Sequence, residues 1–388
     1  MKIALQIEKN RAHGRAMLKG IADYALEQTD WQLELVEPES LTRASYLAQF
    51  DGLIVRVMDD QTSKALIRSG KPVVDTYGRI DLNPLRSIRL DDAALAKMAY
   101  EYFAEHHYRS FAYCGFDGLR FSEARGEAFR KQVETNGGEC RVFRVPELKR
   151  IRDTFFRNEK TDVPDARPLR AWLKSLPKPT AVFCCNDLRA VQVMKVCADC
   201  EVRVPAELAV LGVDNDVLLC TFAKPSLSSI ETDPFSLGRT AAEMLHDQLR
   251  GGSGRRRKSS AGFVPVLHRP KRVIERVSTD AYSFKDPWLE DAVRFIRRHL
   301  AEGVTADAVV KRIGYSHPVV NRAFVRELGR SVKQEILHQR LRLACAMLRD
   351  TALSASAISA RCGYRSPQYF SQSFMASLGQ TPESWRKR

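Results

Sequence analysis

Apolar runs and amphipathic segments alternate along the first 280 residues. Residues 52–57 and 208–213 are rich in branched apolar side chains, which is typical of strands buried on both faces of a parallel sheet. Residues 14–28 and 91–106 instead repeat apolar positions every three or four residues, as a helix packed on one side does. Further strands are predicted over 2–7, 31–37, 72–75, 110–114, 140–145, 181–185 and 263–267, and further helices over 122–136, 167–176 and 188–200. The alternation predicts an α/β domain of two parallel sheets, which form two hinged lobes that close on one cleft.

The C-terminal part follows a different pattern and repeats one unit twice. In each copy a short amphipathic helix leads to a Gly-Tyr turn, at Gly314 or Gly363, and a second helix then ends on Phe324 or Phe374. This is the pattern of a helix-turn-helix, whose second helix enters the major groove of DNA. The two units are predicted over residues 305–328 and 354–378, with additional helices over 288–300 and 331–349. We therefore expect an α/β domain over residues 1–280 and an all-α domain over residues 281–388.

Charge is unevenly distributed between these two parts. The chain has a formal net charge of +15. Residues 281–388 hold 18 Lys and Arg against 9 Asp and Glu, whereas residues 1–280 hold 44 against 38. Such an excess of positive charge on a small helical domain favours a polyanionic partner, and duplex DNA fits the repeated unit.

The length of the apolar runs and the positions of the cysteines indicate in which compartment the protein acts. No apolar run approaches the roughly 18–20 residues of a membrane span, and the polar turn at Glu8 leaves no signal-peptide core. The nine cysteines are scattered through apolar segments, which fits reduced thiols rather than a disulfide framework. Cys197 and Cys200 have no second pair at zinc spacing, so core packing is favoured over a metal site. We expect a cytoplasmic protein that has no membrane contact, no metal and no cofactor.

Short motifs follow one another in a characteristic order along the first domain. They are Gly52-Leu-Ile, Pro72-Val-Val-Asp75, Arg125-Gly-Glu-Ala-Phe129, Asn186-Asp187, Gly212-Val-Asp-Asn215, Pro225-Ser-Leu-Ser-Ser-Ile230, Leu237-Gly-Arg-Thr-Ala-Ala242 and Arg276-Val-Ser-Thr-Asp280. In this order they resemble the LacI/GalR-type effector domain, which is similar to periplasmic sugar-binding proteins. The resemblance implies that a small sugar binds between the two lobes.

The same resemblance supplies candidate effector-binding residues. By family position these are Arg15, Asp75, Arg125, Asn186 and Asp214, with Asp187, Arg189 and Asn215 beside them. Arg and Asp side chains suit vicinal hydroxyls because charge-assisted hydrogen bonds are the strong ones. The alternative for each residue is a loop cap or a structural salt bridge.

The helical domain resembles the AraC/XylS-type DNA-binding domain. The second unit carries the more specific residues, namely Gly363-Tyr364, Phe370, Phe374, Leu378-Gly379 and Thr381-Pro-Glu-Ser-Trp-Arg386. The order of the two domains resembles that of sugar-responsive activators of pentose operons. It implies a homodimeric transcription activator whose effector is D-xylose or a related pentose, and whose partners are operator DNA and RNA polymerase.

Helical spacing separates core from DNA-facing positions in the second helix of each unit. Val320 and Phe324, like Phe370 and Phe374, are expected to face inward. The remaining positions match the family's DNA-contacting residues: Ser316, Pro318, Asn321 and Arg322 in the first unit, and Arg365, Ser366, Gln368, Ser371 and Gln372 in the second. Asn and Gln suit adenine and Arg suits guanine, while Arg365 and the helix N-termini suit phosphate. The alternative is an exposed helix face without a partner.

Two other classes of protein are compatible with an α/β domain of this kind. A sugar-modifying enzyme is disfavoured because the eight histidines are scattered and no Gly-x-Ser-x-Gly, P-loop or His-Glu-x-x-His motif occurs. A sugar-binding transport component is disfavoured by the missing signal peptide and the basic repeat. We therefore predict a sugar-responsive regulator and no enzymatic activity.

Overall fold

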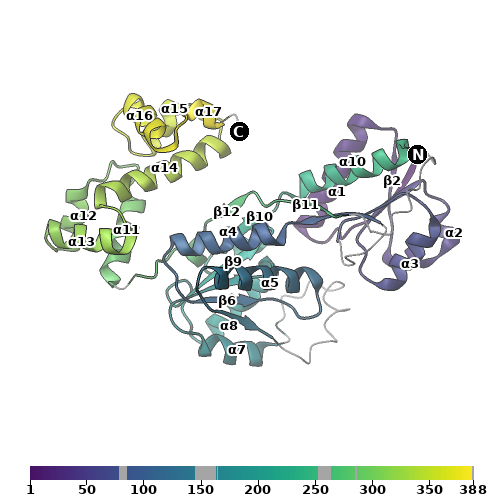
Figure 1. Ribbon diagram of the computed structural model, residues 1–388, viewed down its shortest axis with the longest axis horizontal. Coiled ribbons are helices and arrows are strands. Elements are labelled where there is room, and N and C mark those ends of the chain that lie inside the picture. The colour runs from purple at the N-terminus through teal and green to yellow at the C-terminus, as the bar shows by residue number, and fades with distance from the viewer. Residues whose placement is uncertain (78–84, 145–162, 164, 252–263, 285, 387–388) are drawn as a thin grey trace. The chain divides into compact units, whose positions relative to one another are not determined.

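The computed structural model (Figure 1) describes all residues except 78–84, 145–162, 164, 252–263, 285 and 387–388. The chain divides into two compact units, Met1–Ala281 and Tyr282–Arg388. The first unit contains two six-stranded sheets and the second is helical. The α/β architecture with two parallel-dominated sheets and a helical C-terminal region confirms the predicted fold class.

The first lobe is a sheet of order β11-β5-β4-β3-β1-β2 in which every neighbouring pair is parallel. Its strands are β1 Lys2–Gln6, β2 Gln32–Leu35, β3 Gly52–Val55, β4 Val73–Asp75, β5 Arg86–Leu90 and β11 Val266–His268. Successive side chains of a strand point to opposite faces. Ile3 and Leu5 accordingly pack with α1 (Ala12–Gln28) and α10 (Pro234–Arg250), whereas Ala4 belongs to the cluster that contains Leu66 of α3 (Asp60–Ser69). Two short helices, η1 Pro38–Thr42 and α2 Ala44–Leu47, lie between β2 and β3 along the chain.

The second lobe repeats this plan with the order β12-β10-β9-β8-β6-β7. Its strands are β6 Phe111–Cys114, β7 Cys140–Phe143, β8 Thr180–Cys184, β9 Leu208–Val213, β10 Ser228–Glu231 and β12 Arg272–Ile274. All pairs are parallel except β10 with β12. Helices α4 (Asp92–Glu105) and α5 (Arg120–Thr135) cover one face. The other face packs with α7 (Ala166–Ser175), α8 (Asp187–Asp199) and α9 (Val217–Phe222).

Three described segments carry the chain between the lobes: β5 to α4, β10 to α10, and β11 to β12. They are joined to one another. The backbone N–H of Asp91 donates to the carbonyl of His268 at 2.9 Å, and that of Lys271 donates to Glu231 at 2.8 Å. The Lys271 ammonium also lies 2.9 Å from the carboxylate of Asp233. Crossings tied together in this way form a hinge, as in other two-lobed binding domains.

Buried hydroxyl groups fix the last residues of the first unit to the second sheet. The Ser278 hydroxyl donates to the carbonyl of Val210 at 2.6 Å and accepts from the backbone N–H of Ser228 at 2.8 Å. The Thr279 hydroxyl lies 2.7 Å from that of Ser228 and 2.6 Å from that of Tyr102. The short helix η3 (Val277–Thr279) that ends this unit is therefore part of the second lobe.

The second unit consists of helices arranged around two cores. They are α11 Pro287–Arg298, α12 Ala306–Ile313, α13 His317–Leu328, α14 Val332–Asp350, α15 Ala355–Arg361, α16 Pro367–Leu378 and α17 Pro382–Arg386. One core joins α11 to α13 with Ile336 of α14, and the other joins α15 to α17 with Ala344 and Leu348 of the same helix. Gly363 lies where the two halves meet, because a Cβ added there would be 1.7 Å from the carbonyl oxygen of Leu300.

Predicted and observed elements agree to within two residues at most boundaries. The predicted strand 263–267 begins outside the described residues and is observed as Val266–His268. The sequence pattern missed η1, α2, α3, β5, α9, β10, β12, η3 and α17. Short length explains most of these omissions, and β5 (Arg86–Leu90) includes two arginines among its five residues, so it lacks an apolar run. No helix in the described part of the chain is long and apolar enough to cross a membrane.

Candidate ligand pocket and nucleic-acid interface

A cavity of about 770 Å³, counted to its open mouth, lies between the two lobes of the first unit. Its walls are Glu8, Arg11, His13, Arg56, Thr76, Tyr77, Arg89, Leu90 and Leu237 from the first lobe and hinge, and Asp92, Arg120, Phe121, Ala124, Arg125, Asn186 and Asp214 from the second. Most of them lie at or just beyond the carboxyl end of a parallel strand, which is where ligands bind in α/β sheets.

Arg125 is a buried cation at the wall of this cavity. Its side chain is almost wholly buried, and its Nε donates to Asp92 at 3.1 Å while Nη1 donates to the carbonyl of Cys185. Burial acts to lower the pKa of Arg125, but the charges of Asp92 and Asp214 outweigh it and raise the pKa. The guanidinium is thus a fixed, charged donor.

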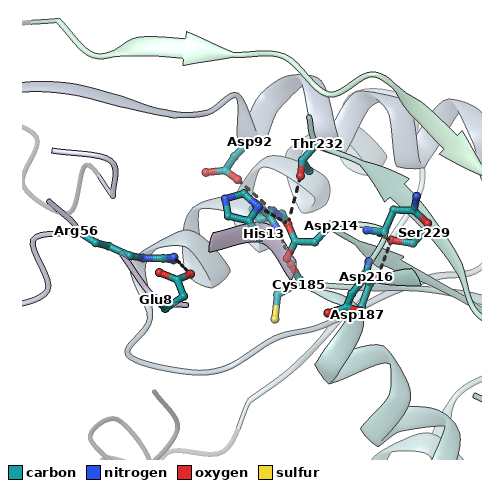
Figure 2. A network of polar contacts seen from close by, with 12 residues as sticks. Glu8, His13, Arg56, Asp92, Cys185, Asp187, Asp214, Asp216, Ser229 and Thr232 are labelled. Carbon is teal, nitrogen blue, oxygen red and sulfur yellow. Dashed lines mark hydrogen bonds and ion pairs between the residues drawn. The ribbon is translucent and has the colours of Figure 1, made fainter. Parts of the chain in front are cut away.

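Asp214 supplies a carboxylate at the end of β9. Its backbone has a φ of 104°, which a residue with a side chain rarely adopts and which costs conformational energy. Oδ1 lies 3.4 Å from Nδ1 of His13 and accepts from the Thr232 hydroxyl at 3.5 Å (Figure 2). Burial would raise the pKa of Asp214, but His13 and, to a smaller extent, Arg125 hold that pKa below its ordinary value. An ionised acceptor therefore faces the cavity at neutral pH.

A second ion pair, between Glu8 and Arg56, comes from the first lobe (Figure 2). Burial alone would raise the pKa of Glu8, and the charges of Arg56 and His13 hold it below its usual value. The Arg56 guanidinium also lies over the ring of Tyr77, 5.0 Å from its centroid. The cavity therefore combines fixed charges of both signs with the aromatic rings of Tyr77 and Phe121.

Three of the expected effector-binding residues line the cavity. Arg125, Asn186 and Asp214 meet there although they lie far apart in the sequence. Asn186 also caps α8, since its side-chain oxygen accepts from the backbone N–H of Arg189 at 2.9 Å. The geometry brings these side chains together, and their contact with an effector stays a prediction.

The other candidates are not among the lining residues, and their contact with an effector likewise stays a prediction. Arg15 is exposed, and its guanidinium donates to the carbonyls of Lys9 at 3.2 Å and Asn10 at 2.6 Å. Asp75 is buried beneath the wall, where it accepts from the backbone N–H groups of Val57 at 3.1 Å and Tyr77 at 2.9 Å. Both residues therefore shape the loops that carry lining residues.

Asp187, Arg189 and Asn215 are likewise engaged elsewhere. Asp187 accepts from the Ser229 hydroxyl at 2.5 Å and from the backbone N–H of Asp216 at 2.7 Å (Figure 2). Arg189 forms a buried ion pair with Asp165 at 2.5 Å.

The side-chain oxygen of Asn215 accepts from the Arg276 guanidinium at 2.8 Å. These contacts with other protein groups hold the loops of the second lobe that carry Asn186 and Asp214.

Several lining residues were not among the sequence-based candidates. They are Glu8, Arg11, His13, Arg56, Arg89, Asp92, Arg120 and Phe121. The strand-end rule that located the other candidates also applies to Glu8 and Arg56, which follow β1 and β3.

The candidate nucleic-acid interface is formed by α13 and α16. Val320, Phe324, Phe370 and Phe374 are fully buried, which confirms the expected inward face. Among the DNA-contact candidates Ser316, Pro318, Asn321, Arg322, Arg365, Gln368 and Gln372 are exposed, and Ser366 and Ser371 are half-buried. Each second helix therefore presents polar side chains opposite its core face.

Side-chain contacts at the ends of α13 and α16 complete the description of these helices. The Ser366 hydroxyl caps α16 by accepting from the backbone N–H of Tyr369 at 3.2 Å, whereas Ser316 occupies the N-cap position of α13 without a side-chain cap bond. The Asn321 side chain accepts from the backbone N–H of Val332 at 3.4 Å, so it also links α13 to the start of α14. His317 was not a candidate, yet it lies exposed in the first turn of α13, 3.0 Å from Asp307.

The cysteines and potential metal ligands make no further site. All nine cysteines are free thiols. Among the described residues no group of three or more His, Cys, Asp or Glu side chains is placed to hold a metal ion.

Comparison with known families and proteins agrees with this two-part organisation. Residues 100–279 match a periplasmic binding protein-like domain, and residues 296–388 match a helix-turn-helix domain. The xylose operon regulatory protein of Escherichia coli strain K12 is 29% identical over 99% of this chain and 96% of its own length. That of Haemophilus influenzae is 28% identical over 99% and 98%.

Solved structures show the same relationship. A structure described as a xylose-binding transcription activator covers 100% of this chain with 29% identity and a TM-score of 0.60, over 97% of its own chain. A LacI family regulator from Enterococcus faecium, with bound ribose, covers 72% of this chain and 98% of its own at 18% identity and a TM-score of 0.55, which supports the fold of the first unit.

These relatives are transcription regulators, which confirms the prediction of a regulator in place of an enzyme. The helix-turn-helix domain makes DNA a partner of the protein. The chain therefore joins a periplasmic binding protein-like domain to a C-terminal helix-turn-helix domain, and it is similar along nearly its whole length to the xylose operon regulatory proteins.

Proposed function

We propose that a small carbohydrate bound in the cavity between the lobes controls DNA binding by this regulator. The observation that carries the proposal is the meeting of Arg125 and Asp214 in one cavity, a fixed donor and a fixed acceptor of opposite charge. Such a pair suits vicinal hydroxyls, and Tyr77 and Phe121 supply apolar surface for a sugar ring. The names of the relatives make D-xylose, or a related pentose, the first ligand to test.

Closure of the lobes around the ligand is the proposed mechanism. The ligand contacts both lobes, so it binds the closed form more tightly and shifts the population toward it. The three tied crossings, near Asp91, Glu231 and Lys271, support a hinge motion. Because η3 is bonded to the second sheet, it moves with the second lobe. Closure therefore changes the orientation, relative to the first lobe, of the segment that leads into the DNA-binding unit.

DNA contact is assigned to the exposed faces of α13 and α16. Arg322, Gln368 and Gln372 are proposed to contact base edges, and Arg365 to contact phosphate. The connecting helix α14 has 19 residues and is therefore about 28 Å long. A spacer of this length supports contact with two successive major-groove segments by one subunit.

The regulator is proposed to act as a homodimer in the cytoplasm, where operator DNA lies. Val217, Leu218 and Phe222 of α9 are 60%, 59% and 76% exposed, and such apolar patches mark interfaces. A second copy of this chain is proposed to cover these side chains. Phe222→Glu should then lower the molar mass measured by light scattering to that of a monomer, whereas Leu26→Glu, at an 87% exposed site on α1, should not. A dimer that persists in Phe222→Glu would exclude this interface.

Activation is proposed because one solved relative is described as an activator. It requires contact with RNA polymerase in the DNA-bound state. Transcription from the chain's own upstream promoter by purified polymerase should rise when protein and ligand are added together, and a fall would indicate a repressor.

The central experiment is a gel shift on the DNA upstream of the chain's own gene, with and without D-xylose and other pentoses. Asp214→Ala should abolish the effect of the sugar on DNA binding, and Asp247→Ala, an exposed carboxylate on α10, should preserve it. If Asp214→Ala responds to the sugar as the unmodified protein does, the cavity is not the sensing site.

A further inference from the structure

We infer that exposed apolar side chains on both recognition helices read the 5-methyl groups of thymine in the major groove of DNA. They are Val319 and Val325 of α13 and Tyr369 and Met375 of α16. The inference rests on the proposed contact of these two helices with DNA. It adds four residues to the DNA-contact candidates and names the chemical group that they recognise.

The two recognition helices correspond residue by residue. Each has 12 residues, with a serine at its N-cap and a glycine at its C-cap. The buried Phe324 of α13 matches the buried Phe374 of α16. The four apolar side chains therefore form two matching pairs, which are Val319 with Tyr369 and Val325 with Met375.

Exposure of large apolar side chains in the helical unit is concentrated at these positions. The four side chains are between 37% and 50% exposed, and in the described part of this unit Tyr315 is the one other large apolar residue that is exposed. Single exposed apolar residues are common, but their recurrence at matching positions of a repeat indicates a shared contact. A partner that meets both pairs presents the same surface twice, and successive segments of the major groove do so.

In each helix the apolar pair flanks a polar residue that is assigned to a base edge. In α13, Arg322 lies three residues from both Val319 and Val325. In α16, Gln372 lies midway between its pair in the same way. Residues three apart are neighbours on the surface of a helix, so each apolar side chain lies beside a base-reading one. The apolar group that the major groove offers next to the polar base edges is the thymine methyl.

Restricted side-chain rotation favours this contact in the first turn of each helix. Val319 is branched at Cβ, which confines its χ1 angle within a helix. The Tyr369 ring packs against the buried Tyr364, with 6.1 Å between the ring centroids. Both side chains therefore lose little conformational entropy when a base contacts them. They also lie in the N-terminal part of the helix, which reaches base edges in helix-turn-helix proteins.

The test compares thymine with deoxyuridine, which lacks the 5-methyl group and keeps every hydrogen-bonding group of the base. Full-length protein is titrated in gel shifts against the DNA upstream of the chain's own gene, with thymine replaced first throughout and then at single positions. Each contacted methyl is an apolar group of about one CH2, so its loss should weaken binding about four-fold. With one contact or more in each DNA segment, full replacement should weaken binding by roughly ten-fold or more.

Serine variants assign each methyl group to its side chain. Serine removes the apolar contact and has a helix propensity close to that of valine and tyrosine. In Val319→Ser and in Tyr369→Ser, one of the single replacements that weaken binding of the unmodified protein should have no effect, because that methyl has already lost its partner. Val325→Ser and Met375→Ser test the second pair in the same way. Ala360→Ser, on the exposed face of α15, is the matched control and should keep the full preference for thymine.

Two results would overturn the inference and leave the recognition helices in place. The first is a change of less than about two-fold on full replacement, or an equal change in the unmodified protein and all four serine variants, while Arg322→Ala still weakens binding. The second is full thymine preference in the serine variants together with loss of activated transcription by purified polymerase. The apolar side chains would then contact protein and not DNA.

A third result would overturn more than the inference. If Arg322→Ala and Gln372→Ala bind the upstream DNA as the unmodified protein does, and the serine variants do so too, α13 and α16 do not contact the bases. The reading of thymine methyls then falls together with the proposed assignment of these helices.

Discussion

The guanidinium of Arg276 donates a hydrogen bond of 2.8 Å to the side-chain oxygen of Asn215. Asn215 directly follows Asp214 of the cavity wall, and Arg276 directly precedes η3, whose Ser278 is bonded to β9. Arg276 also donates to the carbonyl of Leu227 at 2.8 Å. One side chain thus connects the residue next to the cavity with the end of the sensing unit.

Asn215→Gly should separate ligand binding from the DNA response. The substitution deletes the acceptor, while the φ of 51° at this position suits glycine. We expect ligand affinity to stay nearly unchanged and the ligand-dependent change in DNA affinity, on the order of 5- to 150-fold in allosteric proteins, to approach one. Fluorescence anisotropy of labelled operator DNA with and without ligand measures this. Asn136→Gly, on the exposed end of α5, is the control, and an unchanged response in Asn215→Gly would exclude the connection.

Asp187→Asn should stabilise the protein increasingly as the pH rises. Burial, then the charge of Asp214, raises the pKa of Asp187 well above its ordinary value of 3.8. The unfolded chain therefore ionises this group more easily than the folded chain, and stability present at low pH is lost as the pH rises above 3.8. An asparagine side chain does not ionise, so the protein loses no stability at this position as the pH rises. Its amide still has an oxygen that can accept from the Asp216 N–H and an NH2 group that can donate to Ser229.

The measurement is the melting temperature at pH 5 and pH 8. The gain from Asp187→Asn should be larger at pH 8. Asp199→Asn, an exposed carboxylate at the end of the same helix, should give no pH-dependent gain. Equal gains for Asp187→Asn at both pH values would contradict a raised pKa.

The buried ion pair of Arg189 and Asp165 should matter for stability and not for ligand affinity. Asp165→Ala leaves a buried guanidinium without its carboxylate, which costs about 3–5 kcal/mol of unfolding free energy. Arg203→Ala at the exposed pair with Glu207 should cost less than about 1 kcal/mol. Urea unfolding measures both.

Replacing the whole pair tests the assignment further. Arg189→Met combined with Asp165→Leu should recover much of the lost stability and bind ligand as the unmodified protein does, since Arg189 does not line the cavity. Loss of ligand binding in this folded double variant would restore Arg189 as a contact residue.

Arg322 and Arg365 should respond differently to truncation. Arg322→Ala is expected to relax specificity at one base position by about 1–3 kcal/mol, because a base-reading arginine is lost. Arg365→Ala should weaken binding to all sequences evenly and reduce the salt dependence. Binding to a library of single-base operator variants at two salt concentrations distinguishes these patterns, and an even loss in Arg322→Ala would make it a phosphate contact.

The fold was predictable because its elements depend on local periodicity, which β9 and α4 display plainly. Pocket residues were predictable where a strand end coincided with a family motif, as at Arg125, Asn186 and Asp214. The contacts that Arg15 and Arg189 make were not predictable, because their partners are not visible in the sequence pattern. The carbonyls of Lys9 and Asn10 reach Arg15 only through the shape of one loop, and Asp165 reaches Arg189 only through packing of α7 with α8.

The close packing at Gly363 has a consequence for the spacing of the two DNA segments in the operator. The backbone of Gly363 touches that of Leu300, and α14 contributes to both helical cores, so the two recognition helices are fixed in rotational phase. Inserting about five base pairs, half a turn of duplex, between the two contacted segments would rotate one of them to the far side of the DNA. Natural target sites should therefore tolerate base changes between their two contacted segments far better than changes in their separation.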